Sequence, residues 1–129
     1  MKQLLAIALL LVAVACEESP ASPTLPATFT LAPGATARAE DARVTFVRVE
    51  SDSRCPIDAN CVSAGEATIL VRVAAAGLDG EYALSLLDAA RRSVNHRGYV
   101  ITFTALEPYR DTRHQPNPGD YRATIEVAK

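Results

Sequence analysis

The sequence predicts an all-β fold, a small immunoglobulin-like β-sandwich of six to eight short antiparallel strands. Apolar residues alternate with polar ones at a period of two from about residue 27 onward. Turn residues recur about every ten residues, as they do in sandwiches and barrels. Only 5% of the 129 residues are aromatic, so the core must be aliphatic. An open β-barrel is the first alternative and an α+β arrangement the second.

The first two expected strands are separated by a turn. Residues 28–31 form the first strand, and the proline-glycine pair at 33–34 ends it. The second strand covers 43–50, where the apolar phase slips between Phe46 and Val47. Such a slip indicates a β-bulge or burial on both faces.

The remaining strands follow from the same alternation. Residues 67–73 give the clearest pattern, and Gly77 and Gly80 bracket the turn expected after them. The segment 86–92 is long enough for one helical turn but too short for a packed helix. Further strands are expected over 82–86, 99–103 and 121–127.

The first fifteen residues have the layout of an export signal. One lysine precedes an apolar run over residues 4–14, and small residues then occupy a cleavage position. At about 11 residues the run is too short to span a bilayer as a helix, which takes about 20. We therefore expect residues 1–15 to be a signal peptide.

The four residues Ala13-Val14-Ala15-Cys16 resemble a bacterial lipobox. In that motif a diacylglyceryl group is attached to the cysteine thiol, and cleavage leaves the cysteine as the first residue. The strongest form of the motif has leucine where this chain has Ala13. The alternative is an ordinary signal-peptidase site followed by a cysteine. The resemblance implies a lipoprotein of the cell envelope, anchored through Cys16 and facing the periplasm or the cell exterior.

The segment after Cys16 predicts a stiff tether. Its three prolines suppress helix and favour extended polyproline II, at about 3.1 Å per residue. About ten such residues would hold a domain roughly 30 Å from a lipid surface. The chain thus divides into a signal peptide at 1–15, a lipidated cysteine with its tether at 16–26, and a β-sandwich domain at 27–129.

The cysteines predict one disulfide. The chain has three, and Cys55 and Cys61 lie close together between two expected strands. In an exported domain such a pair forms a structural disulfide, worth roughly 2 kcal/mol for so small a loop. Cys16 is then the odd cysteine, and lipidation would remove its free thiol.

The cysteine-containing loop carries a second resemblance. Asp-Ser-Arg-Cys-Pro at 52–56, followed by Cys-Val-Ser-Ala-Gly at 61–65, is similar to a motif of uncharacterised small bacterial lipoproteins. Those proteins tend to have an aromatic residue, usually tryptophan, where this chain has Ser63, so a role carried by that aromatic does not transfer. The resemblance implies a shared fold and no known activity.

The same loop contains hard oxygen ligands of the kind that calcium prefers. Their spacing matches no calcium-binding loop, so a structural clip is the leading interpretation. A calcium site and a recognition loop presented by the clip are the alternatives. Asp52 and Asp58 are the alternative partners for Arg54, in an ion pair that would again be structural. The weak candidate ligands are Asp52, Asp58, Asn60 and Glu66.

The longest interior loop, 107–120, is a candidate binding loop. It places positive charge in a chain whose formal net charge is −2. Its prolines would stiffen it and lower the ordering cost of binding. A carboxylate- or phosphate-bearing partner would suit it, whereas a plain solvated crossover is the alternative. The candidate contact residues are Tyr109, Arg110, Arg113 and His114.

No catalytic motif is recognisable. The nucleophile elbow, the zinc-binding His-Glu-x-x-His and the glycine-rich phosphate loops are missing from the sequence. His96 is interpreted as an exposed residue of a hairpin turn. A triad of Ser63, Asp111 and His114 can be drawn, but its spacing does not support it.

These observations predict a non-enzymatic, lipid-anchored module without a cofactor. It would bind an unknown protein or anionic ligand, or stabilise an envelope structure, with the N-terminal lipid as its membrane contact. The lack of a basic excess argues against nucleic acid. A protease-inhibitor-like use of loop 107–120 and calcium binding at 52–66 are the alternative functions.

Overall fold

The computed structural model describes residues 21–129, and the expected signal peptide at 1–15 and Cys16 lie outside this range. The strands are β1 (Ala27–Leu31), β2 (Thr36–Ala39), β3 (Ala42–Asp52), β4 (Ala67–Ala75), β5 (Leu78–Ser85), β6 (Ser93–His96), β7 (Tyr99–Glu107) and β8 (Arg122–Ala128), with a short 3-10 helix, η1 (Pro118–Asp120), before β8. The first strand begins at the residue where the sequence places the start of the domain.

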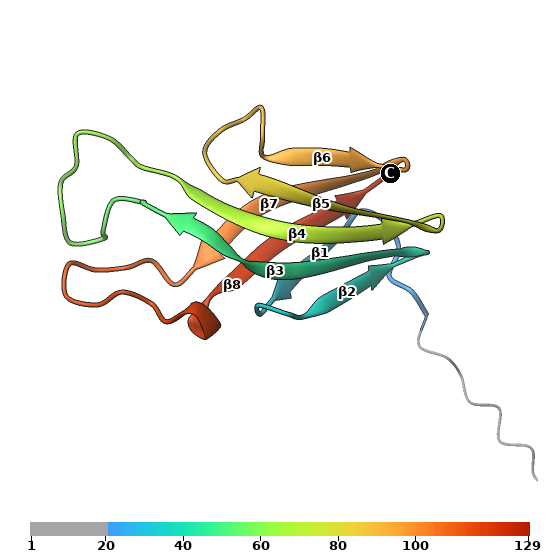
Figure 1. Cartoon of the computed structure of the whole chain (residues 1–129), viewed down its shortest axis with the longest axis horizontal. Coiled ribbons are helices and arrows are strands. Elements are labelled where there is room, and N and C mark those ends of the chain that lie inside the picture. The colour runs from blue at the N-terminus through green and yellow to red at the C-terminus, as the bar shows by residue number, and fades with distance from the viewer. Residues whose placement is uncertain (1–20) are drawn as a thin grey trace, which may run out of the picture.

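The strands form two antiparallel four-stranded sheets (Figure 1). One has the order β1-β8-β7-β6 and the other β2-β3-β4-β5. No strand pairing within residues 21–129 joins the two sheets, so the predicted sandwich is confirmed and the barrel alternative is not observed. The immunoglobulin-like prediction holds for the two layers. The consecutive strands β2–β5 and β6–β8 form meanders, with β1 beside β8, whereas immunoglobulin domains use Greek keys.

The core lies between the sheets and follows the predicted period of two. In β4, every second residue from Ala67 to Ala75 is buried, while the residues between them reach the surface or its margin. The core is mainly aliphatic, and two phenylalanine rings, Phe46 and Phe103, are fully buried within it. Each such side chain contributes about 1.5–3 kcal/mol relative to exposure.

The phase slip predicted in the second strand is a β-bulge. The pairing of β3 with β4 shifts register between Phe46 and Arg48, and again between Val49 and Ser51. Two four-residue strands, β2 and β6, were not predicted. Both are too short to show a clear alternation, and each is fixed by its pairing with the following strand.

The turn after β4 lies earlier than the sequence suggested. Its central residues are Ala76 and Gly77, both with positive φ, 50° and 75°. This backbone shape matches the right-handed twist of the two strands it joins. Gly80 belongs to β5 instead, where an added Cβ would lie 2.6 Å from the hydroxyl of Tyr82. Glycine at this position therefore makes room for the tyrosine ring.

The prediction that His96 is an exposed turn residue is wrong. The turn is Arg97-Gly98, and His96 ends β6 with 6% of its surface exposed. Its Nε2 donates to the carbonyl oxygen of Leu78 at 3.0 Å, and the Tyr82 hydroxyl lies 2.7 Å from Nδ1. The ring thus links the edge of one sheet to the edge of the other.

Candidate functional site

The two longest loops project from the same end of the sandwich (Figure 1). The cysteine loop, residues 53–66, joins β3 to β4, and the β7–β8 loop comprises residues 108–121. We call this the loop end. β1 begins at Ala27, which pairs with Val127 at the far end of β8 from the β7–β8 loop. The chain therefore enters the domain at the opposite end, which we call the tether end after the tether expected at residues 16–26.

A buried ion pair forms the base of the loop end. The side chains of Arg54 and Asp52 are each 2% exposed. Two hydrogen bonds of 2.8 Å join them, from Nε to Oδ1 and from Nη2 to Oδ2. The expected pairing of Arg54 thus falls on Asp52. Removing one partner of such a pair leaves an uncompensated buried charge, which costs about 3–5 kcal/mol.

Arg54 also ties the cysteine loop to the β7–β8 loop. Its Nη1 donates to the carbonyl oxygen of Leu106 at 2.6 Å, and its Nη2 donates to that of Pro108 at 3.1 Å. The guanidinium carbon lies 4.0 Å from the ring centre of Tyr109, in a cation–π contact. In return, Arg110 donates from Nε to the carbonyl oxygen of Arg54. One side chain thus fixes both loops at their bases.

The electrostatics of the pair favour its charged form. Burial raises the pKa of the Asp52 carboxyl, but hydrogen bonds from Arg54 and Tyr121, with the charge of Arg54, lower that pKa to below its ordinary value. Burial likewise lowers the pKa of Arg54, and the hydrogen bond and charge of Asp52 raise it above its usual range. The Tyr121 hydroxyl donates to Asp52 Oδ2 at 3.0 Å.

A second clasp joins the tips of the loops. The Asp58 carboxylate accepts two hydrogen bonds from Thr112, one from the backbone N–H at 2.8 Å and one from the hydroxyl at 2.6 Å. These bonds lower the pKa of Asp58. Asp111 accepts from the backbone N–H groups of Arg113 and His114, at 2.8 and 2.7 Å. The tip of the β7–β8 loop is therefore braced from both sides.

The predicted disulfide is present and closes the cysteine loop. Cys55 and Cys61 are bonded, with their Cα atoms 5.9 Å apart. The base of the loop is a short ladder in which Ser53 N donates to Glu66 O at 2.7 Å and Cys55 N donates to Ala64 O at 3.0 Å. Gly65 has φ +71°, and an added Cβ there would collide with the backbone carbonyl of Ser53.

The structure does not bring the candidate calcium ligands together. Asp52 faces Arg54 and Asp58 faces Thr112, whereas Glu66 accepts from the backbone N–H groups of Ala67, Leu87 and Asp88. Asn60 is exposed. Within residues 21–129, no group of three or more His, Cys, Asp or Glu side chains is arranged to hold a metal ion.

The candidate residues of the β7–β8 loop have two different roles. Tyr109 and Arg110 hold the loop against Arg54, whereas Arg113 and His114 are exposed at the tip. The side chain of His114 is 80% exposed, and its Nδ1 lies 3.2 Å from Asp111 Oδ1. Ser63 is the third residue of the triad drawn from the sequence, and its hydroxyl accepts a hydrogen bond from the backbone N–H of Gly65.

Exposed apolar side chains gather on these loops. Of the five large hydrophobic residues that are exposed in the described chain, three belong to the two loops: Ile57, Val62 and Tyr109. Ile57 is 71% exposed and Val62 is fully exposed. An open groove of about 290 Å³ extends from Tyr109 to Leu87, another exposed apolar residue. Ile57 and Val62 could have been identified from the sequence, because each is an isolated aliphatic residue in the polar loop that contains the disulfide.

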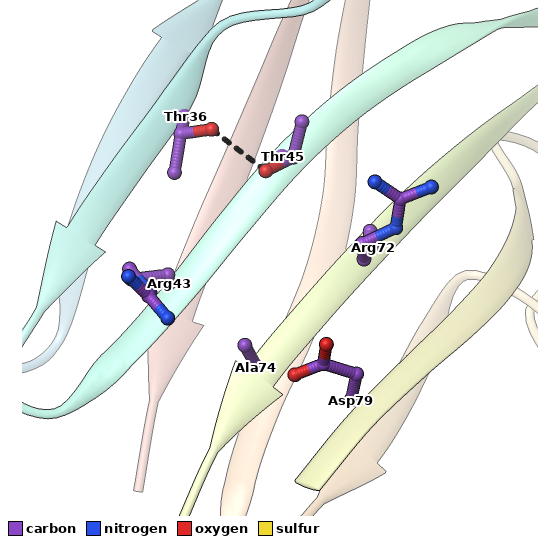
Figure 2. A pocket seen from close by; sticks show the side chains of 6 residues that line it. All are labelled: Thr36, Arg43, Thr45, Arg72, Ala74 and Asp79. Carbon is purple, nitrogen blue, oxygen red and sulfur yellow. Dashed lines mark hydrogen bonds between the residues drawn. The ribbon is translucent and has the colours of Figure 1, made fainter. Parts of the chain in front are cut away.

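A different hollow, of about 220 Å³, lies over the β2-β3-β4-β5 sheet (Figure 2). The hydroxyls of Thr36 and Thr45 share a 2.7 Å hydrogen bond, and Arg72 bonds Glu81 at 2.6 Å. The hollow contains none of the residues predicted to form a site. Its lining is Thr36, Arg43, Thr45, Arg72, Ala74 and Asp79.

The described part of the chain contains no helix with the length and hydropathy needed to cross a membrane. The chain matches no protein-family model, no curated protein and no solved structure.

Proposed function

We propose that this chain is a lipid-anchored, extracytoplasmic β-sandwich that binds a partner protein through its loop end and catalyses no reaction. The observation that carries the proposal is the clasping of the two loops by Arg54 and Asp58 at the end farthest from Ala27. Loops held by a rigid scaffold are the usual place for recognition.

The chemistry of the loop end supports protein recognition. Apolar side chains that stand exposed on a fixed backbone lose little entropy on binding, so the area they bury contributes to affinity. Ile57, Val62 and Tyr109 are of this kind. Arg113 and His114 add hydrogen-bond donors at the rim, and Arg113 adds positive charge. The partner surface that fits best is apolar at its centre with carboxylates at its edge.

The placement of the tether supports the same proposal. β8 has seven residues and is about 23 Å long at about 3.3 Å per residue. A lipid on Cys16, followed by an extended segment to Ala27, would hold the tether end toward the membrane. The loop end would then face away from the lipid surface, where a partner can reach it.

The anchor is tested by mass spectrometry of the mature protein from bacterial membranes. We expect cleavage before Cys16, a mass increase equal to two or three acyl chains, and release of the Cys16→Ser variant from the membrane. A chain that retains Met1 and carries no fatty acid would contradict the proposal.

Binding at the loop end is tested by photo-crosslinking in cells. A photoreactive amino acid replaces Ile57 in one variant and Leu78 in the control. Both residues are exposed, at 71% and 49%, but Leu78 follows the β4–β5 turn at the tether end. We expect a discrete adduct from position 57 and none from position 78. Equal adducts at both positions, or none at either, would contradict binding at the loop end.

A protease-inhibitor-like module is a second candidate, favoured by the bracing of the β7–β8 loop. The backbone N–H of Arg113 donates to the Asp111 carboxylate, and the Arg113 side chain is exposed. A protease that cleaves after arginine is the enzyme class it would fit. Inhibition of trypsin at micromolar concentration, lost on Arg113→Ala, is the expected result. Cleavage of the loop without inhibition would remove this candidate.

A further inference from the structure

Part of strand β3 has no partner along one edge. β2 pairs with β3 only between Ala42 and Thr45, although β3 continues to Asp52. On the other edge, β4 pairs with β3 as far as Asp52. The edge over residues 47–52 therefore has no strand beside it in the described part of the chain, and Figure 1 shows β3 extending past β2 toward the loop end.

An open groove of about 680 Å³ runs along this free edge. Six successive residues of β3, 47–52, line it. Successive side chains of a regular strand point to opposite faces, so a run of six lining residues, in a stretch that two bulges twist, indicates that the edge of β3 faces the groove. The remaining lining residues are Pro33, Gln115, Pro116, Pro118, Gly119 and Tyr121.

We propose that this groove binds an extended peptide segment of a partner protein, which adds as a strand to the free edge of β3. An unpaired strand edge presents N–H and C=O groups that only another extended backbone can satisfy together. The free stretch is roughly 20 Å long at about 3.3 Å per residue, which is the length of an average strand.

The charges around the groove select an uncharged peptide. Arg48 and Glu50 pair with each other at 3.0 Å, and Asp52 is neutralised by Arg54. The wall opposite β3 is formed largely by Pro116, Pro118 and Gly119, which bring no charge, and its prolines have no N–H to compete for the peptide backbone. The ligand that fits is a neutral segment with apolar side chains at alternate positions.

The bulges of β3 favour a peptide over a second copy of this chain. Register shifts follow Phe46 and Val49, so the free edge is irregular. Bulged edges are a common protection against pairing between identical strands. Two copies would have to match two irregular edges, whereas a flexible peptide has to match only one. The groove uses β3 and the second half of the β7–β8 loop, and it requires neither the lipid anchor nor the exposed side chains of Ile57, Val62 and Arg113, so it goes beyond the function proposed above.

The probe is a set of peptides selected from a random dodecapeptide display library on the full mature protein in mild detergent. We expect selected peptides that are uncharged, rich in alternating apolar residues, and bound with micromolar Kd in fluorescence anisotropy. Hydrogen–deuterium exchange should slow at residues 47–52 when a selected peptide binds. Protection confined to the loop tips, or no binding at 100 μM, would overturn the proposal.

A groove-filling variant provides the specific control. An added Cβ at Gly119 meets no atom within 4 Å, so the position has open space for a side chain, and we expect Gly119→Trp to fill the groove that Gly119 lines. The matched control is Ala90→Trp, on an exposed turn outside the groove. We expect peptide affinity to fall at least tenfold for Gly119→Trp and to stay unchanged for Ala90→Trp, with both melting normally. Equal affinities, or a dimer of the free protein that only Gly119→Trp abolishes, would overturn the assignment to a peptide.

Discussion

Arg54 determines whether the loop end is a fixed surface or two independent loops. Replacing it with methionine should cost about 3–5 kcal/mol, because the Asp52 carboxylate is left buried without a counter-charge. Arg72→Met is the control, since the Arg72–Glu81 pair is about half exposed and worth at most about 1 kcal/mol. Urea denaturation of both variants measures the difference. Similar losses would show that Arg54 does not have the structural role assigned to it.

Gly65 is required for a different reason, which is backbone geometry combined with lack of space. Gly65→Ala meets both a positive φ of 71° and the carbonyl of Ser53, whereas Gly34→Ala meets only a positive φ of 85° in open space. Strain of this kind costs roughly 1 kcal/mol, and the collision adds to it. We expect Gly65→Ala to lower the melting temperature clearly more than Gly34→Ala does. Equal shifts would contradict a collision at Gly65.

At the scale of elements, the long strands were predictable and the short ones were not. β4 shows its alternation over nine residues, whereas β2 and β6 have four each and are defined by pairing with β3 and β7. The disulfide was predictable from the spacing of Cys55 and Cys61, given the expectation that the chain is exported. The burial of Arg54 did not, because arginine is rarely buried unless paired and its further acceptors, the carbonyls of Leu106 and Pro108, are remote in sequence. His96 was misplaced because its partners Tyr82 and Leu78 lie on the other sheet.

The cysteine loop should remain folded when its disulfide is removed, although the domain becomes less stable. Cys55→Ser with Cys61→Ser releases a small loop in the unfolded chain, which costs roughly 2 kcal/mol. In the folded protein, the Arg54 and Asp58 contacts still hold the loop to its neighbour. The expected result is a lower urea midpoint with unchanged exchange protection of the backbone N–H groups at positions 53 and 55 in native conditions. Loss of that protection would show that the disulfide, and not the two clasps, orders the loop.

At the scale of the whole molecule, the two ends of the sandwich differ in kind. The tether end carries Ala27, the β4–β5 turn and the C-terminal Lys129, whose ammonium bonds Glu40 at 2.6 Å. The loop end carries the buried ion pair, the disulfide and most of the exposed apolar side chains. The proposed lipid anchor before Ala27 would place the attachment at one end and the rigid loops at the other, which suits a module that presents a binding surface at a fixed distance.

Acid should destabilise the whole domain, in part through Asp52. The pKa of this carboxyl is lowered in the folded protein, so its contribution to the free energy of unfolding is complete above the unfolded pKa of about 3.9 and is lost as pH falls through the folded value. Tyr121→Phe removes one donor to Asp52, so its stability deficit relative to the unsubstituted protein should shrink between about pH 5 and pH 2. Thr68→Val removes a hydroxyl bonded only to Ser85, and its deficit should stay constant over that range. Urea midpoints measured across this interval compare the two. Parallel curves for both variants would mean that the Tyr121 hydroxyl does not stabilise the charged form of Asp52, and the electrostatic account of the loop end would then be wrong.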